Sequence, residues 1–317
     1  MPERVATPGV WHSPPHRTDL TGAVPRVGGP NPGMVGPAVI DLHVHSAVSD
    51  GTDRPETIPE LAVAAGCSAV ALTDHDTLAG LVAARRRAAE LGIELVGGCE
   101  VSCAFLGTGT HVLVYFVDHE EGELHDELAR LREDRVHRNR RLAELLASLG
   151  VPITYEEAVA VAASEDSLGR PHFAALLVTK GVAESIPDAF ERWLAEGRPA
   201  FVPKARVPPA QIARAATAVG GVCVLAHPLS LDLSAGELDR AVAQLAEAGF
   251  SGLEAHYASY RPEQRRALAE LATRHDLVAT GGSDYHGTVK PGLAIGTGRG
   301  DLNVPNEVLE RLEARRP

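Results

Sequence analysis

Seven short runs of apolar residues along this chain each lead into a histidine, an aspartate or a glutamate. Helix-like stretches separate most of these runs, and short apolar runs in that setting are typical of buried parallel strands. Because the carboxyl ends of parallel strands meet at one mouth of a barrel, we expect the polar side chains to gather there. The runs lie at residues 39–45, 69–75, 93–100, 111–117, 222–227, 252–254 and 278–286.

The order of strand and helix patterns predicts an α/β fold with an insertion. Helical patterns at 57–66 and 78–91, each ended by a glycine, alternate with the first strands and indicate a parallel sheet with helices outside. From 120 to 205 only helical patterns occur, and the alternation resumes at 222. We therefore expect a β/α barrel formed by 39–119 and 206–317, with a small all-helical subdomain at 120–205 that covers the active site.

Composition narrows the classes of function. The 317 residues carry a formal net charge of −12, which disfavours binding to long nucleic acid or to an anionic membrane. No apolar stretch is long enough to span a bilayer. The four cysteines contain no C-x-x-C pair, and we expect small buried residues in a cytoplasmic protein. Residues 1–38 are rich in proline and glycine, which favours a disordered tail over a signal peptide.

The first two strands carry candidate metal ligands. His43 and His45 are two apart on a strand, so their side chains share a face and are well placed to chelate one ion. Asp50 follows them in a turn, where a simple capping role is equally possible. At the end of the second strand His75 is a candidate ligand, and a neighbouring carboxylate such as Asp76 could orient its imidazole.

The later strands carry the remaining candidates. Glu100 follows two glycines and could bridge two ions, whereas His111 opens its strand, so that strand register alone does not place it. His227 ends the fifth strand, and Asp284 and His286 follow the seventh. Any one of them could be an ordinary core or loop residue. Their shared position at strand ends favours a cluster of divalent metals.

Six spaced motifs carry a resemblance to a known family. The motifs H-x-H, T-D-H-D, G-x-E-V, H-x-L-x-Y-F, A-H-P and G-S-D-x-H follow in this order between about 39 and 300. The chain thus resembles the polymerase-and-histidinol-phosphatase (PHP) family of metal-dependent phosphoesterases. An aspartate after H-x-H, an R-x-x-R-x-x-R helix and an R-x-H-F element make it most similar to the branch of nucleoside 3′,5′-bisphosphate phosphatases and 5′–3′ exonucleases.

The resemblance implies a distorted seven-stranded TIM-like barrel that holds two or three ions. One ion would be held by His43, His45, Glu100 and Asp284, a second by Glu100, His111 and His227, and a third by Asp50, His75 and His286. Family members use Mn²⁺, Zn²⁺, Fe²⁺ or Mg²⁺. A set of imidazoles and carboxylates without thiolate disfavours Mg²⁺, and we expect Mn²⁺.

These features predict hydrolysis of phosphate monoesters of small nucleotides by a metal-bound hydroxide. Arg132, Arg135 and Arg138 recur every three residues, as expected of one helix face, and a solvated basic face is the alternative. The resemblance favours phosphate contacts by Arg135, Arg138, Arg170 and His172. Tyr257, Tyr260 and Lys290 could line the same pocket or serve in packing.

One departure from the family concerns substrate recognition. Many relatives follow A-H-P with a glycine and a basic residue, whereas this chain has Leu229 and Ser230. The metal chemistry is unaffected, but recognition of a bisphosphate could differ. Alternatives are therefore a 5′–3′ exonuclease on short oligonucleotides, a histidinol-phosphatase-like enzyme, and a non-catalytic PHP module, which would lack ligands that this chain retains.

Overall fold

The computed structural model describes residues 39–317 apart from 118–120, 163–164 and 166, and the tail expected at 1–38 lies outside this range. Its centre is a seven-stranded sheet in which the strands neighbour one another in chain order. The strands are β1 (Val39–Asp41), β2 (Cys67–Leu72), β3 (Glu94–Phe105), β4 (Thr108–Tyr115), β5 (Val222–Leu225), β6 (Gly252–Tyr257) and β7 (Val278–Gly282).

The sheet curves into a nearly closed barrel. Strands β1 to β3 are parallel to one another, as are β5 to β7, but β4 runs antiparallel to both of its neighbours. The segment that follows β1 bonds to β7 and to the residues after it: the amide of Leu42 donates to the carbonyl of Gly281 (3.2 Å), and the amide of Asp284 donates to that of His43 (2.8 Å). The predicted α/β barrel is confirmed, with one reversed strand as its distortion.

Amphipathic helices cover the outside of the barrel. Gly66 and Gly92 end the first two helical segments with positive φ values of 79° and 71°, a conformation that glycine adopts without strain. The helices are α1 (Thr57–Ala64), α2 (Leu81–Leu91), α7 (Pro209–Ala218), α8 (Ala235–Glu247), α9 (Pro262–Arg274) and α10 (Glu307–Glu313). Among the described residues, no helix is both long and apolar enough to cross a membrane.

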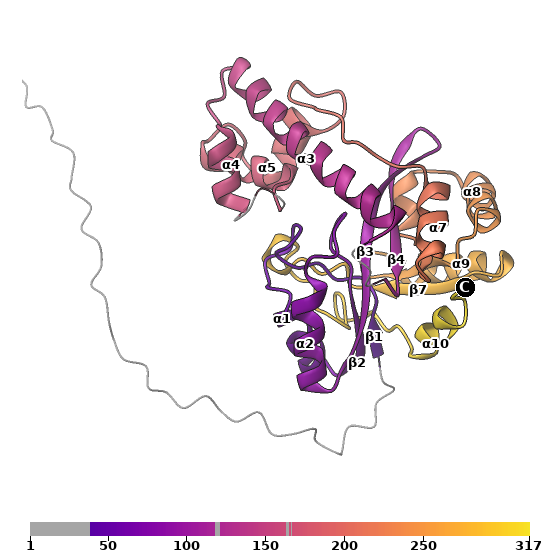
Figure 1. Cartoon of the computed structure of the whole chain (residues 1–317). Helices are drawn as coiled ribbons and strands as arrows, with labels where there is room; N and C mark the ends of the chain where they lie inside the picture. Colours follow the sequence, from indigo (N-terminus) through magenta and orange to yellow (C-terminus); the bar gives the residue numbers. More distant parts are fainter. Residues whose placement is uncertain (1–38, 118–120, 163–164, 166) are drawn as a thin grey trace, which may run out of the picture. The chain divides into compact units, whose positions relative to one another are not determined.

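The segment between β4 and α7 is helical and has a hydrophobic core of its own. It contains α3 (Glu123–Ser148), α4 (Tyr155–Ala162), α5 (Arg170–Thr179), α6 (Ile186–Ala189) and a π-helical turn, η1 (Phe190–Leu194). The first half of α3 packs Leu124 and Leu128 into the barrel core, while its second half packs Leu142 and Leu146 against α4 and α5. The helix therefore connects two cores, and it extends from the barrel to α4 and α5 (Figure 1). Its middle carries the predicted arginines.

Candidate metal centre

The ends of β1, β2, β3 and β7 bring the predicted ligands together. His43 and His45 are fully buried on the segment that continues β1, and their Nε2 atoms lie 3.1 Å apart. The close approach depends on Gly282 of β7, because a Cβ there would lie 2.5 Å from the Cβ of His43. Asp284, two residues further on, adopts a positive φ of 52° and places Oδ1 3.4 Å from His45 Nε2. Such strained backbone is common where side chains are held for function.

Glu100 is the central residue of the cluster. Its carboxylate is buried, and its two oxygens face imidazole nitrogens on several sides. Burial alone would raise the pKa of Glu100, but the surrounding imidazoles hold it well below its usual range. Distances of 2.9–3.2 Å separate these oxygens from nitrogens of His43, His45, His75, His111 and His227.

The reversal of β4 explains the position of His111. Because β4 is antiparallel to β3, the start of β4 lies at the same mouth as the ends of the parallel strands. His111 is paired with Ser102, near the far end of β3, and its Nδ1 lies 3.3 Å from Nε2 of His227. The structure thus adds to the cluster a histidine that strand order could not place.

Asp50 joins the cluster from the loop after β1. Asp74 holds this loop by accepting hydrogen bonds from the Ser46 amide (2.8 Å) and the Ser49 hydroxyl (2.6 Å). The carboxylate of Asp50 then faces imidazoles, with Oδ1 3.2 Å from His286 Nε2 and Oδ2 3.7 Å from His75 Nε2. These contacts differ from those of a simple turn cap.

The donor atoms form three groups that could each hold a cation. One group matches the first expected set, the next contains part of the second, and the last adds His45 to the expected third set. The groups are His43, His45, Glu100 and Asp284; His75, Glu100 and His111; and His45, Asp50, His75 and His286.

The chemistry of these groups fits divalent cations. Imidazoles alternate with carboxylates, and no thiolate takes part. Nδ1 of His75 is buried 3.2 Å from a Glu100 oxygen but does not form a hydrogen bond with it. Burial would lower the pKa of His45, but Asp284 and Glu100 raise it to about 9. Because an imidazole must be neutral to bind a metal, cations entering this cluster would displace protons.

Glu254 is a partner of the cluster that the sequence reasoning did not include among the site residues. It is fully buried in the middle of β6, where Oε1 lies 2.8 Å from Nδ1 of His43 and Oε2 accepts from the amide of His227 (2.6 Å). A carboxylate on the far nitrogen of a histidine fixes the ring for metal binding. The signal was present, since this glutamate ends one of the seven apolar runs.

Asp76 has contacts other than the expected one to the ring of His75. Its carboxylate accepts from the amide (2.7 Å) and hydroxyl (2.9 Å) of Ser102 and forms ion pairs with Arg135 of α3 and with Lys204 (3.4 Å). Burial would raise the pKa of Asp76, but Lys204 and Arg135 hold it well below its usual range. This carboxylate therefore ties α3 to the barrel beside the metal centre.

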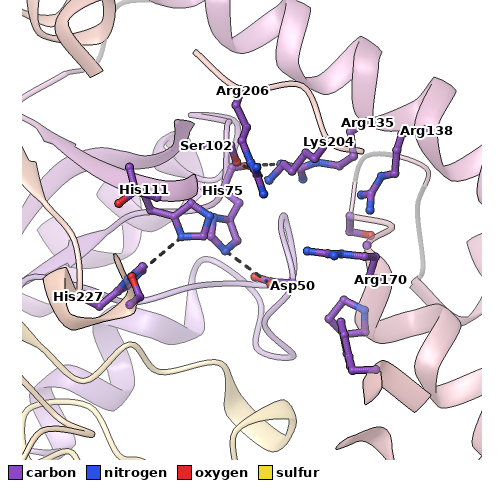
Figure 2. A pocket seen from close by; sticks show the side chains of 17 residues that line it. Asp50, His75, Ser102, His111, Arg135, Arg138, Arg170, Lys204, Arg206 and His227 are labelled. Atoms are coloured by element: carbon purple, nitrogen blue, oxygen red, sulfur yellow. Dashed lines mark hydrogen bonds and ion pairs between the residues drawn. The ribbon is translucent and has the colours of Figure 1, made fainter. Parts of the chain in front are cut away.

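A cavity of about 360 Å³ lies between the metal centre and α3 (Figure 2). Of the four residues predicted to bind phosphate, Arg135, Arg138 and Arg170 line it, together with two cations that the sequence did not reveal, Lys204 and Arg206. The fourth, His172, instead lines a larger and mainly apolar cavity of about 860 Å³, and its Nδ1 accepts from the amide of Gly169 (3.0 Å).

A further cavity of about 510 Å³ adjoins the metal centre and shares His75, His111, His227 and Ser230 with the first cavity. Tyr257, Tyr260 and Lys290 line this second cavity and not the one that the arginines line. The hydroxyl of Tyr257 donates to Oδ2 of Asp284 (2.6 Å), and Lys290 forms an ion pair with the same carboxylate. Two adjoining cavities thus border the metal centre.

Comparisons with known proteins agree with this geometry. A model of the PHP domain matches residues 41–194. The chain is 36% identical to the 5′-3′ exoribonuclease Rnm of Salmonella typhimurium over 78% of this chain and 85% of the relative. It is 30% identical to a 3′,5′-nucleoside bisphosphate phosphatase of Chromobacterium violaceum over 88% of this chain and 98% of the relative. A solved structure from Bifidobacterium adolescentis, predicted to be a metal-dependent phosphoesterase, superimposes with a TM-score of 0.77 at 32% identity, covering 89% of this chain and 98% of that one.

The barrel and its cluster define a metal-dependent hydrolase of phosphoric esters. Within that class, the chain belongs to the PHP family, which confirms the resemblance drawn from the six motifs.

Proposed function

We propose that this enzyme hydrolyses phosphate monoesters of small nucleotides, such as nucleoside 3′,5′-bisphosphates or nucleoside monophosphates. The observation that carries the proposal is the Glu100 carboxylate surrounded by five imidazoles, beside a small cavity with a basic wall. A phosphate ester resists attack because of its own negative charge. Its hydrolysis is promoted by bound cations and by guanidinium groups, and this site offers residues for both.

We propose two or three divalent cations, with Mn²⁺ as the first choice and Fe²⁺, Zn²⁺ or Mg²⁺ as alternatives. When bound, such ions lower the pKa of water and neutralise phosphoryl and leaving-group oxygens. Glu254 orients His43 for this purpose. The residues proposed to hold the ions are His43, His45, Asp50, His75, Glu100, His111, His227, Asp284 and His286.

The helical segment at 120–205 supplies the other half of the proposed site. Arg138 and Arg170 line the cavity and are proposed to bind phosphate oxygens, because a guanidinium matches the geometry of phosphate. Arg135 is held by Asp76, and we propose that it positions the wall that α3 contributes. The segment would then cover the metal centre and limit the access of water.

The proposed substrate is small. The cavity of about 360 Å³ lies near the lower end of the roughly 300–1,000 Å³ that pockets for small ligands occupy. A formal net charge of −12 also disfavours long nucleic acid. We place the enzyme in the cytoplasm, since its four cysteines are free and buried.

A second candidate is 5′–3′ exonuclease activity on short oligonucleotides. Two observations favour it: the exoribonuclease relative, and the two adjoining cavities of about 360 and 510 Å³ that border the metal centre. Together they leave more room than one small nucleotide requires.

Phosphate release from a panel of substrates tests the proposal. The panel contains 5′-, 3′- and 3′,5′-phosphorylated nucleosides, short 5′-phosphorylated oligoribonucleotides and histidinol phosphate, each assayed with Mn²⁺ and after chelation. We expect turnover of the small nucleotides that chelation abolishes. His43→Ala should remove turnover without unfolding the barrel, whereas His137→Ala, at an exposed position of α3, should not. Full activity of His43→Ala would refute the proposed site.

A further inference from the structure

The two carboxylate oxygens of Asp284 have different surroundings. Oδ1 faces the metal cluster, where it lies 3.4–3.5 Å from nitrogens of three histidine rings. Oδ2 instead accepts a hydrogen bond from the hydroxyl of Tyr257 (2.6 Å) and forms the ion pair with Lys290. One oxygen is therefore available to a cation, while the other is held by side chains outside the proposed ligand set.

The backbone of Asp284 is fixed, but the torsion of its carboxylate needs a further restraint. The amide of Asp284 donates to the carbonyl of His43 (2.8 Å), which holds this residue against the segment after β1. The last side-chain torsion of an aspartate has broad, roughly two-fold energy wells, so rotation can bring either oxygen towards a cation. The contacts of Oδ2 with Tyr257 and Lys290 oppose this rotation.

Tyr257 is itself held firmly at the end of β6. Arg265 of α9 is only 8% exposed and donates to the carbonyl of Tyr257 (3.1 Å) and to the next carbonyl along the chain (3.0 Å). The ring of Tyr257 packs edge-to-face on Tyr260, with 4.9 Å between the centroids, and lies 5.7 Å from the ring of His227. The hydroxyl is therefore presented to Oδ2 from a fixed position.

Lys290 adds a charged donor from a different element. It follows η3 (Gly287–Val289), the short 3₁₀ turn after β7, and its side chain is 38% exposed. An ammonium group has only donors, so its contact with a carboxylate oxygen is a charge-assisted hydrogen bond. If Oδ2 turned towards the cluster, it would lose both this bond and the one from Tyr257.

We propose that Tyr257 and Lys290 are positioning residues that restrict Asp284 to one ligating oxygen and thereby influence which cation the site prefers. The inference rests on the proposed metal ligands and adds a determinant of their selectivity. Ca²⁺ takes about six to eight oxygen ligands and accepts carboxylates through both oxygens. A carboxylate limited to one oxygen, among imidazoles, favours transition metals over Ca²⁺.

The test measures cation binding by the full-length chain after chelation. Electron paramagnetic resonance follows free Mn²⁺, and displacement of Mn²⁺ gives the affinity for Ca²⁺. We expect the ratio of the Mn²⁺ affinity to the Ca²⁺ affinity to fall about tenfold in Tyr257→Phe and in Lys290→Gln, the lower end of the effect of partners that orient a metal ligand. The ratio is informative because loss of the Lys290 charge changes the attraction of both divalent cations alike.

Two matched variants serve as controls. Tyr260→Phe removes the hydroxyl of a tyrosine in the same cavity, whose oxygen accepts from the amide of Leu229 (2.9 Å). Lys180→Gln removes a lysine that pairs with Glu157 (2.8 Å) in the helical segment. Both should keep the wild-type ratio.

The possible outcomes separate this inference from the proposed metal centre. An unchanged ratio in either Tyr257→Phe or Lys290→Gln overturns the inference, as does an equal fall in Tyr260→Phe. Because Lys290 is partly exposed, its replacement tests the inference even if loss of the Tyr257 hydroxyl disturbs folding. Wild-type enzyme that binds no Mn²⁺ would instead refute the proposed metal centre.

Discussion

Replacing Asp76 by asparagine tests whether the connection between α3 and the barrel depends on a buried charge. Asp76 is fully buried and has a positive φ of 55°. Asparagine tolerates this backbone conformation, whereas alanine would add strain. Asp76→Asn therefore removes the charge that faces Arg135 and Lys204 while it preserves the shape of the side chain.

The expected loss of stability depends on the hydrogen bonds that Arg135 and Lys204 retain in the variant. Removing one partner of a buried ion pair costs about 3–5 kcal/mol, because an uncompensated charge stays buried. Arg135 keeps its hydrogen bond to the carbonyl of His75 (3.3 Å), and Lys204 keeps its bond to the hydroxyl of Ser102. We therefore expect Asp76→Asn to lower the free energy of unfolding by about 3 kcal/mol, the lower end of that range.

Urea unfolding at neutral pH measures this difference. The control is Asp134→Asn, because Asp134 lies on α3 and pairs with Arg130 at 3.3 Å while 43% exposed. Exposed pairs of this kind contribute about 0–1 kcal/mol. If both variants lost the same small amount, the buried network would contribute no more than a surface pair, and the reasoning would be wrong.

The pH dependence gives a second check on Asp76. Burial would raise the pKa of Asp76, but Lys204 and Arg135 hold it well below its usual range. A carboxyl whose pKa is depressed by folding stabilises the folded state above the unfolded-state pKa of about 4. The difference between wild type and Asp76→Asn should stay constant from pH 7 to 5 and shrink only in more acidic solution. A difference that already fades above pH 5 would contradict this assignment.

Three further substitutions test the support of the metal centre. Glu254→Gln should weaken metal binding about 10- to 100-fold in a metal titration, because the orienting carboxylate on His43 is lost and an amide can face the N–H of His227. Gly282→Ala should cost about 1–3 kcal/mol in urea unfolding and weaken metal binding, because the new Cβ would meet His43 at 2.5 Å. Tyr115→Phe should cost about 1–3 kcal/mol by leaving a buried carbonyl without its donor at 2.7 Å. An unchanged metal affinity or free energy of unfolding in one of these variants would contradict the role assigned to the contact that it removes.

Most of the candidate metal ligands could be predicted, because they follow directly after strands that the sequence reveals as apolar runs. An apolar run that leads into a polar residue fixes both the strand and the position of that residue at the mouth. His43, His45 and Asp284 illustrate this, and their donor atoms form one of the three groups in the structure. Glu254 also ended an apolar run in the sequence, although it lies within β6 in the structure, and it was overlooked because no motif contained it.

The direction of β4 could not be predicted from the hydrophobic pattern. Apolar runs have the same appearance in parallel and antiparallel strands. A weaker signal was present in Leu106 and Gly107, which form the two-residue connection between β3 and β4 with φ values of 51° and 80°. Such a short connection joins only antiparallel strands, and this fixes the location of His111.

The positions of Lys204 and Arg206 could not be predicted, because they depend on a contact between segments that are distant in the sequence. Lys204 and Arg206 lie in a loop without periodicity, about a hundred residues beyond the strand that they approach. The pairing of Cys103 with Val207 brings the loop to the end of β3. Once this bridge forms, Lys204 reaches Asp76 and Arg206 reaches the backbone of Gly109.

The distribution of charged side chains around the cavity explains how a protein with a net negative charge can act on an anionic substrate. On the barrel side, the pKa values of Asp50 and Glu100 are held well below their usual range by nearby imidazoles, which outweigh the effect of burial, so both are ionised at neutral pH. Two unit charges 4 Å apart interact by about 4 kcal/mol at an effective dielectric constant of 20, so these carboxylates repel a phosphate unless cations neutralise them. On the opposite side, Arg138, Arg170 and Arg206 lack a carboxylate partner among the described residues and attract phosphate in either case. A phosphate group in this cavity is therefore attracted by the arginine side and needs cations on the barrel side before it can approach the carboxylates.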